Sequence, residues 1–202
     1  FAVCPANTRE TVYTEGAALY RNQIIKNRNN IVLKEALIDT LLMLHDMRAA
    51  NYPKSAVKAY EAKGKDVFNY FKEEPARLYS EVNKIIDAVG VDTYSSLFIY
   101  KMNAAVKLYE NGEMSKEDVL NDYVSSSDLL DKIISANPSE ANMKSKDEVD
   151  RIFANSGVAE CDDLKSIFEP IYSAVGHEFD ITPLSDDIKI NGKPLKFLVK
   201  EK

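Results

Sequence analysis

Residues 31–48 read IVLKEALIDTLLMLHDMR, the most apolar helix-length stretch of the chain. At about 100° per residue, apolar side chains cover most of such a helix. They are Leu33, Leu37, Leu41 and Leu44 on one face, Ile31, Ile38 and Leu42 beside it, and Ala36, Met43 and Met47 on the opposite flank. A helix of this kind must be covered on two or three sides. We therefore expect it in the middle of a stack of helices, with Leu41 fully buried.

Helical periodicity continues along most of the chain, and seven glycines and seven prolines are few for 202 residues. Both observations favour an all-α fold. We expect further helices at residues 9–27, 55–73, 75–89, 93–111, 115–136 and about 161–175, the last kinked or ended early at Pro170. Ser145 and Glu148 have the spacing of a capping box before one more short helix. Short turns between these segments predict antiparallel helical hairpins.

The run KGKD at residues 63–66 has one glycine and lacks the pattern of a phosphate-binding loop. We expect Gly64 to end or break its helix, with solvated charges around it.

The pattern changes after Gly176. Apolar residues alternate in DIKINGKPLKFLV, residues 187–199, and Asn191-Gly192 is a strong two-residue hairpin turn. We therefore expect a helical domain over residues 1–176 and a small β-hairpin or partly ordered tail over 177–202.

Charge and composition narrow the classes of function. The net charge is −6 and no segment is strongly basic, so a nucleic-acid footprint is absent. No uncharged apolar run approaches the roughly 18 residues of a membrane span. Cys4 and Cys161 form no zinc pattern and no CxxC motif, which leaves two free thiols or one long-range disulfide. Because the chain opens on Phe1, we expect a processed product or a fragment whose targeting signal is missing from view.

The segment Tyr13-x-x-Gly16-Ala17-x-x-Tyr20 resembles the opening of a tetratricopeptide repeat. Leu33 and Ala36 fall where the second helix of that repeat carries a large and a small residue, whereas Asn29 and Leu41 depart from its pattern. The match covers about one hairpin. The resemblance implies a right-handed array of antiparallel helical hairpins that binds a protein or peptide on its concave face. The chain is also similar in style to exported repeat proteins of Bacteroidota, which implies an extracytoplasmic location, in the periplasm or at the cell surface.

The sequence contains no catalytic or metal-binding signature. His45 lies between Ile38 and Leu41 on the helical wheel, which predicts a buried histidine, and no HxxH or ExxH partner accompanies it. The polar stripe of Glu35, Asp39 and Asp46 is either the wall of an acidic groove or the face left to solvent. We therefore predict no enzyme, no cofactor and no metal.

The sequence thus favours a non-catalytic protein- or peptide-binding scaffold. By analogy with helical arrays, the first helix of each hairpin lines the groove, which selects residues 9–27 and 93–111. Side chains there that escape the apolar stripes are the candidate partner-binding residues: Arg21, Asn22, Tyr100 and Asn103. The alternative is an all-α enzyme or small-ligand carrier with a pocket near residues 31–48, which a closed pocket lined by His45 and two carboxylates would favour.

Overall fold

The computed structural model describes residues 9–158 and the backbone of residues 179–183, 189–190, 193–194 and 197–201. Residues 9–158 form seven α-helices, and 3-10 turns at Pro53–Ser55 and Gly90–Asp92 precede α3 and α5. The helices are α1 (Thr11–Lys26), α2 (Ile31–Asn51), α3 (Ala56–Phe71), α4 (Pro75–Val89), α5 (Ser96–Glu110), α6 (Lys116–Ala136) and α7 (Glu140–Asn155). The all-α prediction is therefore confirmed for this part of the chain. Contacts divide the chain into two units, residues 1–152 and 153–202.

Several helix ends follow directly from local sequence. Asn30 caps α2 by accepting a hydrogen bond from the backbone N–H of Leu33 at 3.1 Å. Pro75 occupies the first turn of α4, and Gly90 follows its end at φ 60°, a conformation that suits glycine. Ser115 and Asp118 form a capping box at the start of α6.

Two predicted boundaries are wrong. Helix α3 continues through Gly64, which lies against Leu97 of α5: a Cβ at Gly64 would lie 2.6 Å from Cδ2 of Leu97. Helix α7 begins at Glu140, where the Oγ of Ser139 accepts a hydrogen bond from the backbone N–H of Asn142 at 3.2 Å. Ser145 is instead buried inside α7.

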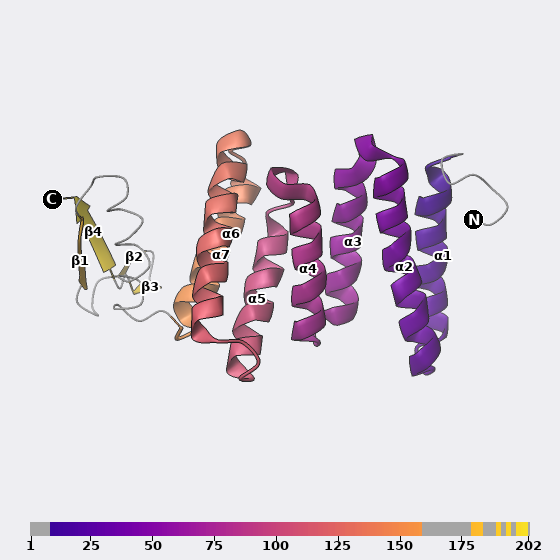
Figure 1. Cartoon of the computed structure of the whole chain (residues 1–202), viewed down its shortest axis with the longest axis horizontal. Coiled ribbons are helices and arrows are strands. Elements are labelled where there is room, and N and C mark those ends of the chain that lie inside the picture. Colours follow the sequence, from indigo (N-terminus) through magenta and orange to yellow (C-terminus); the bar gives the residue numbers. More distant parts are fainter. Residues whose placement is uncertain (1–8, 159–178, 184–188, 191–192, 195–196, 202) are drawn as a thin grey trace. The chain divides into compact units, whose positions relative to one another are not determined.

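Short connections make consecutive helices antiparallel, and α1 to α5 follow one another along the body in chain order (Figure 1). Helix α2 packs between α1 and α3, and Leu41 is fully buried as predicted. Cover by α1 and α3 agrees with the expected two or three sides, and Ile31, Val32 and Met43 lie outside it at 74%, 81% and 50% exposed. The exposed apolar side chains of α2 therefore lie where α1 and α3 do not cover it.

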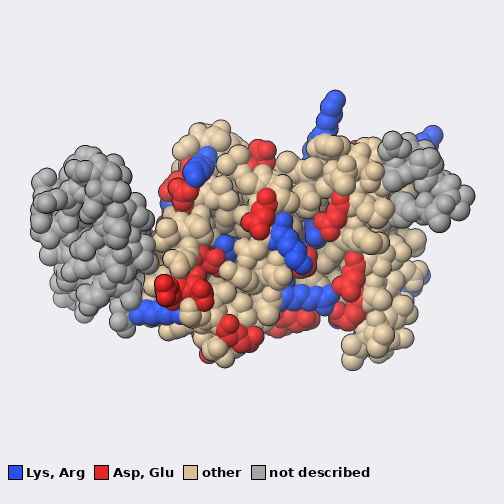
Figure 2. Space-filling model, viewed as in Figure 1, with Lys and Arg blue, Asp and Glu red and all other residues tan. Residues whose placement is uncertain are grey.

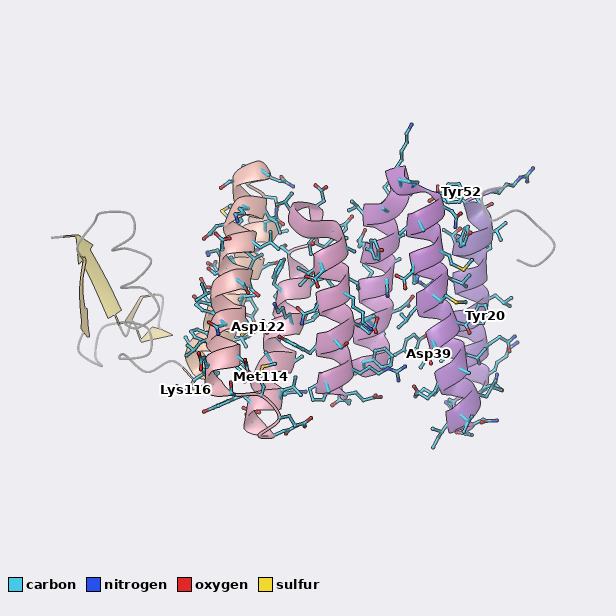
Figure 3. The ribbon with its side chains drawn as sticks, in the orientation of Figure 1. Tyr20, Asp39, Tyr52, Met114, Lys116 and Asp122 are labelled. Carbon is cyan, nitrogen blue, oxygen red and sulfur yellow. The ribbon has the colours of Figure 1, made fainter. Side chains whose placement is uncertain are left out.

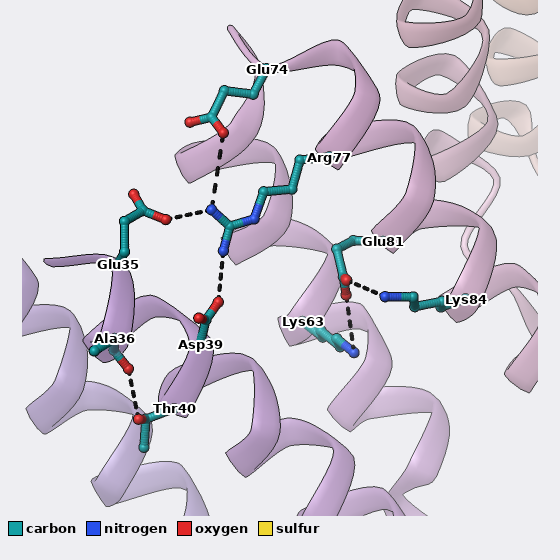
Figure 4. A network of polar contacts seen from close by, with 9 residues as sticks. All are labelled: Glu35, Ala36, Asp39, Thr40, Lys63, Glu74, Arg77, Glu81 and Lys84. Carbon is teal, nitrogen blue, oxygen red and sulfur yellow. Dashed lines mark hydrogen bonds and ion pairs between the residues drawn. The ribbon is translucent and has the colours of Figure 1, made fainter. Parts of the chain in front are cut away.

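Helices two positions apart in the sequence also touch. On the odd-numbered helices, Arg21 of α1 binds Asp66 of α3, and Phe68 of α3 stacks on Tyr100 of α5. On the even-numbered helices, Arg77 of α4 binds Glu35 and Asp39 of α2 (Figure 4), and Tyr79 of α4 donates to Asp122 of α6. Each of these helices is therefore tied both to its neighbour and to the next helix but one.

The described residues of the second unit include four short strands. Strand β1 (Phe179–Pro183) pairs antiparallel with β4 (Phe197–Glu201), with Ile181 opposite Val199. Strand β2 (Lys189–Ile190) pairs antiparallel with β3 (Lys193–Pro194). The predicted turn at Asn191-Gly192, the helix at 161–175 with Pro170, Cys4, Cys161 and the domain boundary at residues 176/177 all lie outside the described residues.

Among the helices that the structure describes, none is long and apolar enough to cross a membrane.

Candidate binding hollow on helices α3, α4 and α5

A surface hollow of about 280 Å³ lies in the first unit. Its lining comes from the end of α3, the start of α4 and the middle of α5, and comprises Phe68, Lys72, Glu73, Pro75, Leu78, Tyr100, Asn103, Ala104 and Lys107. Leu78 and Ala104 are buried and form an apolar floor. Lys72, Glu73, Asn103 and Lys107 are exposed and form a polar rim.

Two stacked aromatic rings form one wall of the hollow. The ring centroids of Phe68 and Tyr100 are 4.1 Å apart, and the ring planes differ by 14°. The contact follows from the close approach of α3 and α5 at Gly64 and Leu97. Phe68 lies one helical turn beyond Gly64 and Tyr100 about one turn beyond Leu97, so both rings reach the same level. An offset aromatic pair of this kind presents a rigid apolar surface.

The rim carries hydrogen-bonding and charged groups. The side-chain amide of Asn103 donates to the carbonyl of Ile99 at 2.9 Å, which leaves its oxygen available as an acceptor. Within residues 9–158, neither Lys72 nor Lys107 has an ion-pair partner. The hollow therefore combines an apolar interior with two available ammonium groups.

The structure brings together two of the four predicted site residues. Tyr100 and Asn103 both line the hollow. Asn22 is exposed on α1, and Arg21 reaches α3, where its Nε and Nη2 donate to the two carboxylate oxygens of Asp66 at 2.8 Å each. Arg21 thus contributes to the fold, a role that the sequence prediction did not include.

The sequence prediction selected two of the nine lining residues, and Phe68, Lys72 and Lys107 are among the seven that it missed. The aromatic residue three or four positions beyond a small helical residue is the signal that could have found Phe68. The two lysines carry no local signal, because their role depends on the pairing of α3 with α5.

Asp66 lies at the centre of a buried cluster that joins three helices. It is 3% exposed and accepts hydrogen bonds from Arg21 of α1 and from Nε2 of His45 of α2, the latter at 2.8 Å. Burial alone would raise the pKa of Asp66, but hydrogen bonds from His45 and Arg21 outweigh it and hold that pKa below its ordinary value. An ionised carboxylate only accepts, so Nε2 of His45 carries the hydrogen. His45 is buried as predicted, with a carboxylate partner that the sequence did not reveal.

The acidic stripe of α2 is largely exposed to solvent and is paired with basic residues of the next helices. Glu35 and Asp39 bind the guanidinium of Arg77 (Figure 4), which also lies 3.9 Å above the ring of Phe71. Asp46 accepts from Nζ of the buried Lys63 at 2.8 Å. The side chains of Asp39 and Asp46 remain 66% and 46% exposed, so the structure favours the solvent-facing interpretation, with ion pairs to α3 and α4 that the sequence did not reveal.

Asp122 (labelled in Figure 3) joins α4, α5 and α6 in a similar way. It pairs with Nζ of Lys101 at 3.1 Å and accepts from the hydroxyl of Tyr79. Burial and the nearby carboxylate raise the pKa of Tyr79 well above its ordinary range. Figure 2 shows basic and acidic side chains side by side across one face of the helical body.

Within the described residues, no group of three or more histidine, cysteine, aspartate or glutamate side chains is arranged to hold a metal ion. No protein-family model, no curated protein and no solved structure matches this chain.

Proposed function

We propose that the chain is a non-catalytic protein- or peptide-binding scaffold, built as a right-handed array of antiparallel helical hairpins similar to tetratricopeptide repeats. The contacts between alternate helices support this arrangement, since stacked hairpins place their first helices in one layer and their second helices in another. The pairs Arg21–Asp66 and Phe68–Tyr100 join α1, α3 and α5, the first helices of three successive hairpins.

The observation that carries the proposal is the hollow itself. It opens on α3 and α5, and it presents an exposed amide and an aromatic wall above an apolar floor. A peptide groove needs both features, because backbone amides require hydrogen-bond partners and an aromatic anchor supplies buried area. Tyr100 and Asn103 are the two side chains that we expect a partner to contact.

The test is capture of the partner from the native source by the full chain with Tyr100→Ala and Asn103→Ala. We expect recovery of the partner to fall at least tenfold, the loss expected when a contact worth more than about 1.4 kcal/mol is removed. A thermal melt checks that the double variant is folded.

A matched control is Tyr109→Ala with Asn111→Ala, at the end of the same helix and outside the hollow. Its asparagine also makes a side-chain hydrogen bond, to Glu113 at 3.0 Å. If the folded Tyr100/Asn103 variant and this control recover equal amounts of the partner, the hollow is not the binding site.

We also propose that residues 187–199 form a β-hairpin that turns at Asn191-Gly192. The antiparallel pairing of β2 with β3 supports the turn, while residues 197–201 pair with β1 instead. Slow amide exchange at Ile190 and Lys193 is the expected result, and exchange as fast as in an unfolded peptide throughout the segment would contradict it.

A further inference from the structure

The rim of the hollow carries a net positive charge, although the chain as a whole is acidic. The rim has Lys72 and Lys107 against the single Glu73, whereas the whole chain has a net charge of −6. The buried lysines of the first unit are used differently: Lys63 and Lys101 are 4% and 7% exposed and are held by carboxylates. The two rim lysines, which have no such partner within residues 9–158, are therefore available to a ligand.

The hollow has room for one large side chain. Its volume of about 280 Å³ lies just below the range of about 300–1,000 Å³ that small-molecule sites occupy. The stacked rings of Phe68 and Tyr100 and the buried Leu78 give it apolar walls. One large apolar side chain fits this environment better than a cofactor or a sugar.

On the basis of the peptide-binding function above, we propose that the hollow binds an acidic peptide segment. One large apolar side chain of the segment inserts beside Phe68 and Tyr100, and carboxylates that flank it in the segment approach Lys72 and Lys107. The side-chain oxygen of Asn103 accepts a backbone N–H of the segment. At physiological ionic strength charges act over about 8 Å, so the rim lysines outweigh the more distant negative charge of the chain.

The experiment uses the full chain and an array of nine-residue peptides blocked at both ends. In each peptide the central residue is leucine, phenylalanine or serine. Most of its flanking positions carry one residue type, which is glutamate, lysine or serine. We expect retention of the glutamate-flanked peptides with central leucine or phenylalanine. Blocked ends assign the recognition to side-chain carboxylates rather than to a terminal one.

The variant that tests the rim is Lys72→Glu with Lys107→Glu, and the matched control is Lys26→Glu with Lys54→Glu. The control residues are exposed lysines that have no ion-pair partner in residues 9–158 and do not line the hollow. We expect the rim variant to lose roughly tenfold in affinity and the control to lose little, because each exposed charge pair contributes a modest amount. If a melt shows the rim variant unfolded, Lys72→Gln with Lys107→Gln replaces it.

Four results with the peptides would overturn the proposal. These are retention that does not depend on the flanking charge, retention of lysine-flanked peptides instead, unchanged binding by the folded rim variant, and retention of no peptide. Binding of a labelled thymidine 12-mer in place of the peptides would also overturn it, in favour of a nucleic acid. These outcomes test only the acidic-peptide proposal. The proposed binding function is tested separately, by capture of the native partner with the Tyr100/Asn103 variant.

Discussion

Asp66 and Phe68 lie only two positions apart on α3, but they have opposite roles. Asp66 faces α1 and α2, is buried, and has its carboxylate saturated by Arg21 and His45. Phe68 faces α5, is half-buried, and forms the wall of an open hollow with Tyr100. Residues two apart on a helix point about 200° apart, so one turn of α3 serves both regions.

The difference separates polar groups that hold the fold from polar groups that can bind. In the Asp66 cluster every strong donor already has an acceptor inside the protein, so a ligand could gain little there. At the hollow, Lys72 and Lys107 have no such acceptor in the described residues, and the apolar floor is open. Changes in the Asp66 cluster should therefore act on stability, and changes at the hollow should act on binding.

The largest expected effect is the loss of Asp66. Asp66→Ala leaves the buried His45 and the guanidinium of Arg21 without their acceptor, and breaking a buried pair costs about 3–5 kcal/mol. Urea denaturation followed by circular dichroism measures the loss. Asn69→Ala, on the exposed side of the same helix, is the control and should stay within about 0.5 kcal/mol of wild type. A loss below 1 kcal/mol in Asp66→Ala would mean that the cluster contributes little to the fold.

Lowering the pH should remove part of the stability that Asp66 contributes. The pKa of Asp66 is lower in the folded protein than in the unfolded chain, where it is about 4. Between these two pKa values the unfolded chain binds more protons, so stability is present above about pH 4 and is lost as the pH falls through the folded pKa.

The comparison of wild type with Asp66→Asn isolates this effect. The variant cannot titrate at this position, so its free energy of unfolding should fall less steeply below pH 4, while other carboxylates titrate alike in both proteins. Denaturation at pH 2 to 7 measures the two slopes. Parallel slopes would show that Asp66 has an ordinary pKa in the folded state.

A third prediction concerns the approach of α3 to α5, which places Phe68 against Tyr100. Gly64→Val adds carbon atoms where even a Cβ would meet Leu97, and overpacking of this kind costs about 1–3 kcal/mol. Leu97→Ala in the same chain should recover part of the loss, because it frees the space. If the double variant is less stable than wild type by the full sum of the two single losses, the two residues do not compete for space.

Local signals predicted most of the helices, but not the two regions compared here. Asn30, Pro75, Gly90 and Ser115 mark helix ends through short-range hydrogen bonds and backbone preferences, so the sequence reveals them.

The burial of Lys63 and Asp66 was invisible from the sequence. Their partners Asp46, His45 and Arg21 come 17 to 45 positions earlier in the chain, so only the packing of the helices shows that these charges are satisfied. The same limitation explains why KGKD was interpreted as a solvated helix end and why Lys72 and Lys107 were not selected.

The smallest expected effect on stability is at the hollow. Tyr100→Ala removes one ring of the stacked pair, and such a pair contributes about 0.5–1.5 kcal/mol beyond the area it buries. Because Tyr100 is half-buried, the total loss should remain well below that of Asp66→Ala. Tyr100→Phe keeps the ring, so its free energy of unfolding should match wild type, and peptide binding should persist if the ring rather than the hydroxyl is the anchor. Urea denaturation and fluorescence anisotropy with a labelled glutamate-flanked peptide measure the two properties on the same samples. A Tyr100→Ala protein as unstable as Asp66→Ala would place Tyr100 in the core of the fold, and the division between the two sides of α3 would be wrong.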